Sequence, residues 1–157
     1  MRKTIISPGT IRPRPDPSEG WLDLERIARV EVTSEDPNFP IESCFAEQGP
    51  GWKTAEKGTQ SIRLVFDEPR PIRRIKLEFL EHDVTRTQEF ALRWSAEPNG
   101  PFREIVRQQW NFTPQGSTSE IEDYQVNLDR VSALELAISP DLGRNNAVAT
   151  LARWLVA

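Results

Sequence analysis

The side chain in this sequence best suited to acid–base chemistry is its one histidine. His82 stands between Glu81 and Asp83, directly after an alternating apolar run. An imidazole could act as a general base, with Cys44 or a serine as the nucleophile. No GxSxG nucleophile motif accompanies it. A hydrolase that uses His82 is therefore the third interpretation of this sequence, behind two that involve no catalysis.

Carbohydrate recognition needs a different set of side chains. An aromatic ring can stack on the apolar face of a sugar ring, while polar side chains hydrogen-bond the hydroxyl groups. The sequence offers both kinds in its candidate loops. The candidate rings are Trp52, Trp110 and Phe112, and the candidate polar partners are His82, Asp83, Arg86, Asn111, Arg144 and Asn145. Trp52 has an alternative role, since a tryptophan in a long loop often packs inward.

Alternation of apolar and polar residues dominates the chain. Ile62, Leu64 and Phe66, for example, alternate with other residues, as in a strand with one face in a core and the other in water. Thirteen prolines and eight glycines punctuate such runs. The pattern predicts an all-β fold with a short helix within 22–28. Its strands are expected at 28–34, 60–67, 72–80, 87–95, 102–109, 119–128, 133–139 and 150–156.

The connections between these strands are of two kinds. Compact turns rich in Pro, Gly, Asn and Asp join three of the strand pairs. Consecutive antiparallel strands reverse direction, so alternate connections lie at the same end of a sandwich. We therefore expect the longer loops, which contain all nine candidate residues, to converge at one end. These loops are 35–59, 81–86, 110–118 and 140–149.

Composition limits the class of protein. A length of 157 residues corresponds to one domain. A single cysteine excludes an internal disulfide and a CxxC metal motif. No run approaches the roughly 18 apolar residues of a membrane span, and a net charge of −4 argues against nucleic acid as a partner. We expect a soluble protein in the cytoplasm.

The first nineteen residues differ from the rest. They carry four basic and two acidic side chains, a net charge of +2, which leaves −6 for residues 20–157. Prolines interrupt this segment, and it has no apolar run typical of a signal peptide. We interpret residues 1–19 as a Pro-rich basic arm and residues 20–157 as the folded domain.

From residue 28 to the end, the order of motifs resembles the discoidin, or coagulation factor V/VIII type C (F5/8 type C), domains among the galactose-binding-like jelly rolls. The motifs that carry this resemblance are VEVTSED, AEQGPGW, QSIRLVFDEPRPIRRIKLEF, FALRWSAEPNGPFREI and LARWLVA. TSEDPNFPIESCF and GWKTAEKGTQSIRLVF are also similar to the amino-terminal domain of a DNA single-strand-break repair scaffold protein.

The resemblance implies a lectin-like, non-catalytic module that binds sugars, lipid head groups or proteins through loops at one end. Many relatives hold a structural calcium with loop oxygens near the AEQG position and a glutamate in the last strand. Here Arg153 stands at that last-strand position, and Glu47-Gln48 replaces the usual Asp-Gly. Since Ca²⁺ takes six to eight oxygen ligands, we expect no metal and no other cofactor.

Together these features predict an antiparallel, eight-stranded jelly-roll β-sandwich that binds carbohydrate. The alternative is a protein–protein interaction module with no small-molecule ligand. Two further expectations concern packing: Trp94 and Trp154 lie in the core, and the acidic run of Glu120, Glu122 and Asp123 faces solvent.

Overall fold

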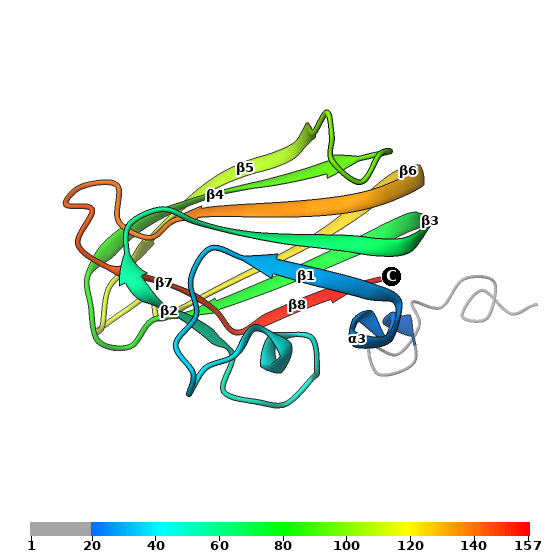
Figure 1. Cartoon of the computed structure of the whole chain (residues 1–157). Helices are drawn as coiled ribbons and strands as arrows, with labels where there is room; N and C mark the ends of the chain where they lie inside the picture. Colours follow the sequence, from blue (N-terminus) through cyan, green and yellow to red (C-terminus); the bar gives the residue numbers. More distant parts are fainter. Residues whose placement is uncertain (1–19) are drawn as a thin grey trace, which may run out of the picture.

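In the computed structural model, which describes residues 20–157, two long strands organise the fold (Figure 1). β3 (Gln60–Leu80) and β6 (Ser119–Ser139) pair along their whole length, with Gln60 beside Ile138 at one end and Leu80 beside Ser119 at the other. Their register shifts repeatedly between Val65 and Arg74. There both strands bend from one sheet into the other, so each contributes one half to each layer of the sandwich.

Shorter strands complete the two layers. β1 (Ala28–Val32) pairs with the first half of β3, and β4 (Arg86–Ser95) joins the second half of β6 to β5 (Arg103–Phe112). In the other layer, β8 (Arg153–Val156) pairs with the second half of β3. β2 (Trp52–Lys57) and β7 (Val148–Leu151) form a separate pair. Among the described residues, β2 is preceded by α3 (Leu24–Ile27) and the 3₁₀ helix η1 (Ile41–Cys44).

The predicted jelly-roll β-sandwich is confirmed, with differences in detail. The runs 60–67 and 72–80 are two halves of β3, and 119–128 and 133–139 are two halves of β6. The last predicted strand is divided at Ala152 into β7 and β8. The segment 35–59, expected to be a loop, contains η1 and β2. Residues 1–19, the predicted arm, lie outside the described residues.

The core lies between the two sheets and is built from the apolar side of each alternation. Ile62, Leu64 and Phe66 point into it from β3, as predicted, together with Phe79, Phe90 and Trp154. Trp94 is half-buried and packs against this cluster.

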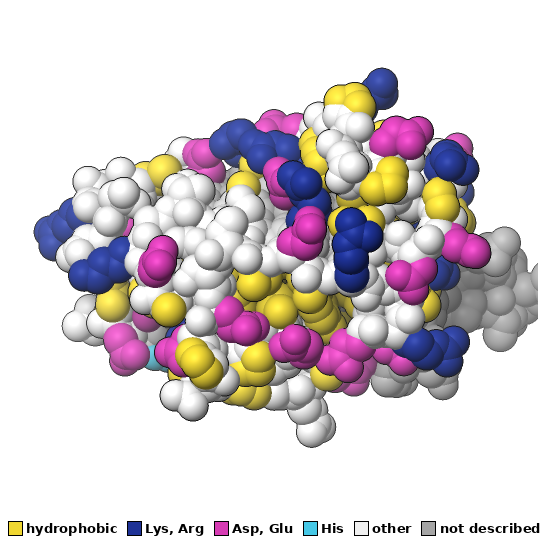
Figure 2. Space-filling model, viewed as in Figure 1, with side chains coloured by type: hydrophobic (Ala, Val, Ile, Leu, Met, Phe, Trp, Pro, Cys, Tyr) yellow, Lys and Arg dark blue, Asp and Glu magenta, His cyan; other side chains and the backbone are white. Residues whose placement is uncertain are grey.

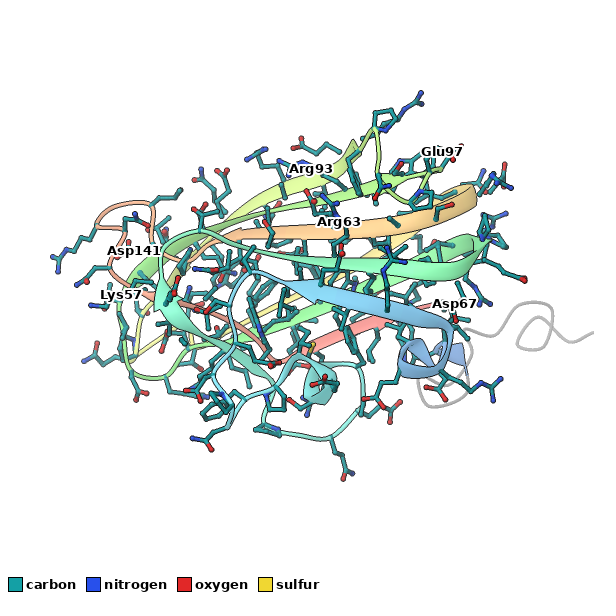
Figure 3. The ribbon with its side chains drawn as sticks, viewed as in Figure 1. Lys57, Arg63, Asp67, Arg93, Glu97 and Asp141 are labelled. Carbon is teal, nitrogen blue, oxygen red and sulfur yellow. The ribbon has the colours of Figure 1, made fainter. Side chains whose placement is uncertain are left out.

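The longer loops lie at one end of the sandwich, as predicted, except for the middle of the segment 35–59. This loop end consists of residues 33–40, 50–51, 81–85, 113–118 and 140–147 together with the β2–β7 pair (Figure 1). η1 and the residues that follow it lie along the side of the sandwich, below β1 in Figure 1. Lys57 and Asp141 lie there in Figure 3, whereas Asp67 and Glu97 mark the opposite end, where the compact turns lie. In residues 20–157, no helix combines the length and apolar character needed to cross a bilayer.

Candidate ligand-binding site

A pocket of about 320 Å³ opens at the loop end. Its walls come from three segments: the loop before β2 with the start of β2, the end of β3 with the loop 81–85, and the β7–β8 segment. Three of the nine candidate residues line it, namely Trp52, His82 and Asp83. The pocket therefore joins parts of the chain that the sequence separates by about a hundred residues.

The rim of the pocket is polar. His82 and Asp83 are exposed, and neither side chain has a hydrogen bond or ion pair with another residue in the described part of the chain. The ammonium of Lys53 lies 4.5 Å from the centroid of the Phe39 ring, a cation–π contact that holds both side chains at the rim. A ligand here would meet an imidazole, a carboxylate and an ammonium within one pocket.

An apolar wall faces this rim. Leu80 and Val84 are 40% and 45% exposed, and Phe39 is half-buried beside them. Trp52 is only 1% exposed, and its indole nitrogen donates to the carbonyl of Ser34 at 3.1 Å. Trp52 is therefore the inward-packing residue that pins its loop to the core, and it cannot present a ring face to a sugar.

Beneath the pocket, Arg86 is a structural hub. Its side chain is fully buried and donates to the Glu81 carboxylate (2.8 Å), the Pro140 carbonyl (2.9 Å) and the Thr150 hydroxyl (3.1 Å). Its guanidinium also lies 4.7 Å from the ring centroid of Phe112. Since its donors are already engaged within the protein, Arg86 positions three segments of the loop end and is not itself exposed to a ligand.

A buried carboxyl group continues this network. Arg86 donates to Gln88 Oε1 (3.1 Å), and Gln88 donates to Glu120 Oε1 (3.1 Å). Glu120 is 0% exposed, and its second oxygen has no hydrogen-bond partner in residues 20–157. Burial, reinforced by the neighbouring Glu122, raises the pKa of Glu120 to about 8. The expectation that this acid faces solvent was wrong.

The remaining candidate residues lie at the same end but outside the pocket. Trp110 and Asn111 line a separate open hollow of about 330 Å³, where the Trp110 indole donates to Ser117 Oγ at 3.0 Å. Phe112 is fully buried, so its ring cannot serve as a stacking surface. Arg144 and Asn145 are exposed on the loop 140–147. The nine candidates therefore do not form a single pocket.

Sequence reasoning missed several residues of the pocket. Lys53 and Thr150 belong to β2 and β7, whose pairing brings Lys53 opposite Thr150. Phe39, Leu80 and Val84 supply the apolar wall. Phe39 could have been found from the sequence, as an aromatic residue in a long loop. Lys53 and Thr150 could not, because the pairing of β2 with β7 joins distant segments and no local sequence pattern indicates it.

The environment of Cys44 does not support catalysis with His82. Cys44 is 0% exposed, and its thiol donates to the carbonyl of Ile41. Burial raises the pKa of this thiol well above its ordinary value. A buried, protonated thiol is a poor nucleophile, so Cys44 offers no support for the hydrolase interpretation.

The residues at the implied calcium position do not fit a calcium ion. The guanidinium of Arg153 donates to the carbonyl oxygen of Glu47 at 2.9 Å, so a cationic side chain already engages the loop oxygen. Among residues 20–157, no three His, Cys, Asp or Glu side chains gather in a group that could hold a metal ion.

No protein-family model and no curated protein matches the sequence. Solved structures do match. A CBM32 module of Clostridium perfringens, in complex with GalNAc-β-1,3-galactose, is 18% identical with a TM-score of 0.65, and the match covers 87% of this chain and 98% of that one. A CBM32 module from a family 31 glycoside hydrolase of the same organism is 17% identical, with a TM-score of 0.65 and coverage of 89% and 96%.

A chitosan-binding module from a chitosanase/glucanase of Paenibacillus sp. IK-5 matches similarly, at 15% identity, a TM-score of 0.61 and coverage of 85% and 97%. Each of these similar chains is covered almost completely, so the likeness extends over a whole module. The chain therefore has the galactose-binding-like jelly-roll fold of the CBM32 carbohydrate-binding modules.

Proposed function

We propose that this chain is a non-catalytic module that binds a carbohydrate in the pocket at the loop end. The composition of that pocket carries the proposal. An apolar wall of Phe39, Leu80 and Val84 faces a rim on which His82 and Asp83 are exposed and without side-chain partners in residues 20–157. A sugar ring has the same two kinds of surface, an apolar C–H face and hydroxyl groups that hydrogen-bond imidazole and carboxylate.

The size and rigidity of the pocket support the same ligand class. A volume of about 320 Å³ is at the small end of ligand sites, which span roughly 300–1,000 Å³. The loop 81–85 is anchored through the ion pair between Glu81 and Arg86, and Glu81 also accepts from the backbone nitrogen of Asp83 (3.2 Å). A small rigid pocket suits one sugar residue whose neighbours extend into solvent.

Structurally similar modules bind sugars, which supports carbohydrate as the class. One was solved with GalNAc-β-1,3-galactose, another with galactose, and a third with 4,5-unsaturated mannuronic acid. These sugars were bound to those similar modules. They are the first ligands to test with this chain: galactose, N-acetylgalactosamine and mannuronate.

Isothermal titration calorimetry with these three sugars tests the proposal. At least one should bind saturably at millimolar concentration. Asp83→Asn should weaken that binding about tenfold, since a hydrogen bond to a charged group contributes about 1.5–3 kcal/mol. Asp67→Asn, at the opposite end of the sandwich, is the matched control and should leave the affinity unchanged.

A protein partner is the second candidate function. Leu80 and Val84 are exposed together in the pocket wall, Leu142, 46% exposed, is a third large apolar side chain at the loop end, and exposed apolar surface is typical of protein contacts. If none of the three sugars binds while a purified partner protein forms a stable complex that Val84→Asp abolishes, the chain is an interaction module instead.

A further inference from the structure

A second hollow lies along strand β1, and nothing in the carbohydrate proposal uses it. This groove of about 480 Å³ runs between β1 and the segment that contains η1. Its apolar lining includes Leu24, Leu64 and Phe45. Figure 2 shows apolar side chains exposed near the middle of this face, with acidic side chains below them.

The groove carries unpaired acids. Glu25 and Glu42 line it, and neither forms an ion pair with another residue of the described chain; Arg29 is the one cation among the lining residues. An apolar floor with uncompensated carboxylates at its border suits a segment that combines aliphatic and basic side chains.

The strand beside the groove has a free edge. Thr33 donates its backbone N–H to Ser61 of β3 (3.1 Å), and the pairing of β1 with β3 continues in register to Ala28. Because hydrogen-bonding directions alternate along an antiparallel strand, the backbone groups of Val30 and Val32 point away from β3. Within residues 20–157 these outward groups have no backbone partner. Such an edge can accept one more strand.

We propose that the groove binds the segment Arg2–Ser7 of this same chain, added as a strand to the free edge of β1. Its sequence, RKTIIS, is free of proline and contains three consecutive β-branched residues, which favour strands. Arg2 and Lys3 would supply cationic partners for the carboxylates of Glu25 and Glu42, which form no ion pair within residues 20–157. Since side chains alternate along a strand, either register directs one of Ile5 and Ile6 toward the apolar floor.

The connection is long enough to allow this pairing. Twelve residues, 8–19, join the segment to Gly20, and they can span at most roughly 40 Å when extended. Leu24, in the wall of the groove, is four residues beyond Gly20. A tether of this length gives the segment an effective concentration on the order of millimolar beside the groove. The pairing is independent of sugar binding.

Amide hydrogen exchange of the full chain, followed by NMR, tests the pairing at single residues. The amide of Val30 points to the free edge, and that of Glu31 points to β3, so Glu31 is an internal reference. In the native chain we expect Val30 to exchange slowly. The double variant Ile5→Ser/Ile6→Ser should speed exchange at Val30 at least tenfold and leave Glu31 unchanged. Ile11→Ser, outside the segment, is the matched control and should change neither.

Reversing the charges of the groove and of the segment tests the role of Glu25 and Glu42 separately. Glu25→Lys/Glu42→Lys should accelerate exchange at Val30, and adding Arg2→Glu/Lys3→Glu to that variant should restore the slow rate. Equal exchange at Val30 in the native chain and in Ile5→Ser/Ile6→Ser would overturn the proposal. So would protection that disappears on hundredfold dilution, since the occupant would then be the segment of a second copy.

Discussion

The guanidinium of Arg86 and the carboxylate of Glu81 form an ion pair at 2.8 Å, with the Arg86 side chain 0% exposed and that of Glu81 13% exposed. The same guanidinium reaches Pro140 and Thr150, so one buried cation holds the loop 81–85, the start of the loop 140–147 and β7 together. The pocket wall that contains His82 and Asp83 depends on this pair for its position.

Removing Arg86 should therefore destabilise the whole loop end. Arg86→Ala leaves Glu81 without its partner, and the loss of one member of a buried pair costs about 3–5 kcal/mol. Urea denaturation at pH 7 measures the free energy of unfolding. The control is Arg107→Ala, which breaks two ion pairs of a half-exposed side chain, with Glu89 and Glu104, and should cost at most about 1 kcal/mol. Equal costs for the two variants would contradict the structural role of Arg86.

The stability of the protein should fall as the pH rises, because of Glu120. Its pKa is raised from 4.5 to about 8, so between these values the folded protein keeps a proton that the unfolded chain releases. The stabilisation is present below pH 4.5 and lost above pH 8, with a slope of at most about 1.4 kcal/mol per pH unit.

Glu120→Gln removes the titrating group and keeps the size of the side chain. The unfolding free energy of this variant should change less between pH 5 and pH 8 than that of the native protein, and at pH 8 the variant should be the more stable of the two. Urea denaturation at both pH values measures this difference. An unchanged pH dependence in the variant would assign the effect to another group.

Replacing either of the two tryptophans of the loop end, Trp52 and Trp110, by alanine should lower the free energy of unfolding by very different amounts. Trp52 is fully enclosed and hydrogen-bonded to Ser34, so Trp52→Ala should cost about 3–5 kcal/mol of unfolding free energy. Trp110 is half-buried outside the pocket, so Trp110→Ala should cost less than half as much and leave sugar affinity intact. Loss of sugar binding in Trp110→Ala without loss of stability would move the site to the hollow beside Ser117.

The sheets and the common end of the loops could be predicted because both follow from local patterns. Alternation such as that of Ile62, Leu64 and Phe66 identifies a strand and its buried face, and strand reversal then fixes which loops are neighbours. β2 could not be found this way, since its partner β7 lies about ninety residues away and its sequence, WKTAEK, does not alternate.

The inward position of Glu120 could have been found by extending the alternation. Tyr124, Val126 and Leu128 pack against the core, so counting back by twos from them places Glu122 and Glu120 on the same face and Ile121, 57% exposed, on the other. Charge alone misled the prediction. The sequence did not show that Gln88 would lie next to Glu120 and donate a hydrogen bond to its carboxyl group.

The carbohydrate proposal is tested most directly by NMR of the ¹⁵N-labelled chain during separate titrations with galactose, N-acetylgalactosamine and mannuronate. With at least one of them, saturable shifts should cluster at Phe39, Lys53, His82, Asp83 and Thr150, and leave the compact turns at the opposite end unmoved. Saturable shifts confined to the hollow of Trp110 and Asn111, or no saturable shift with any of the three sugars, would contradict it.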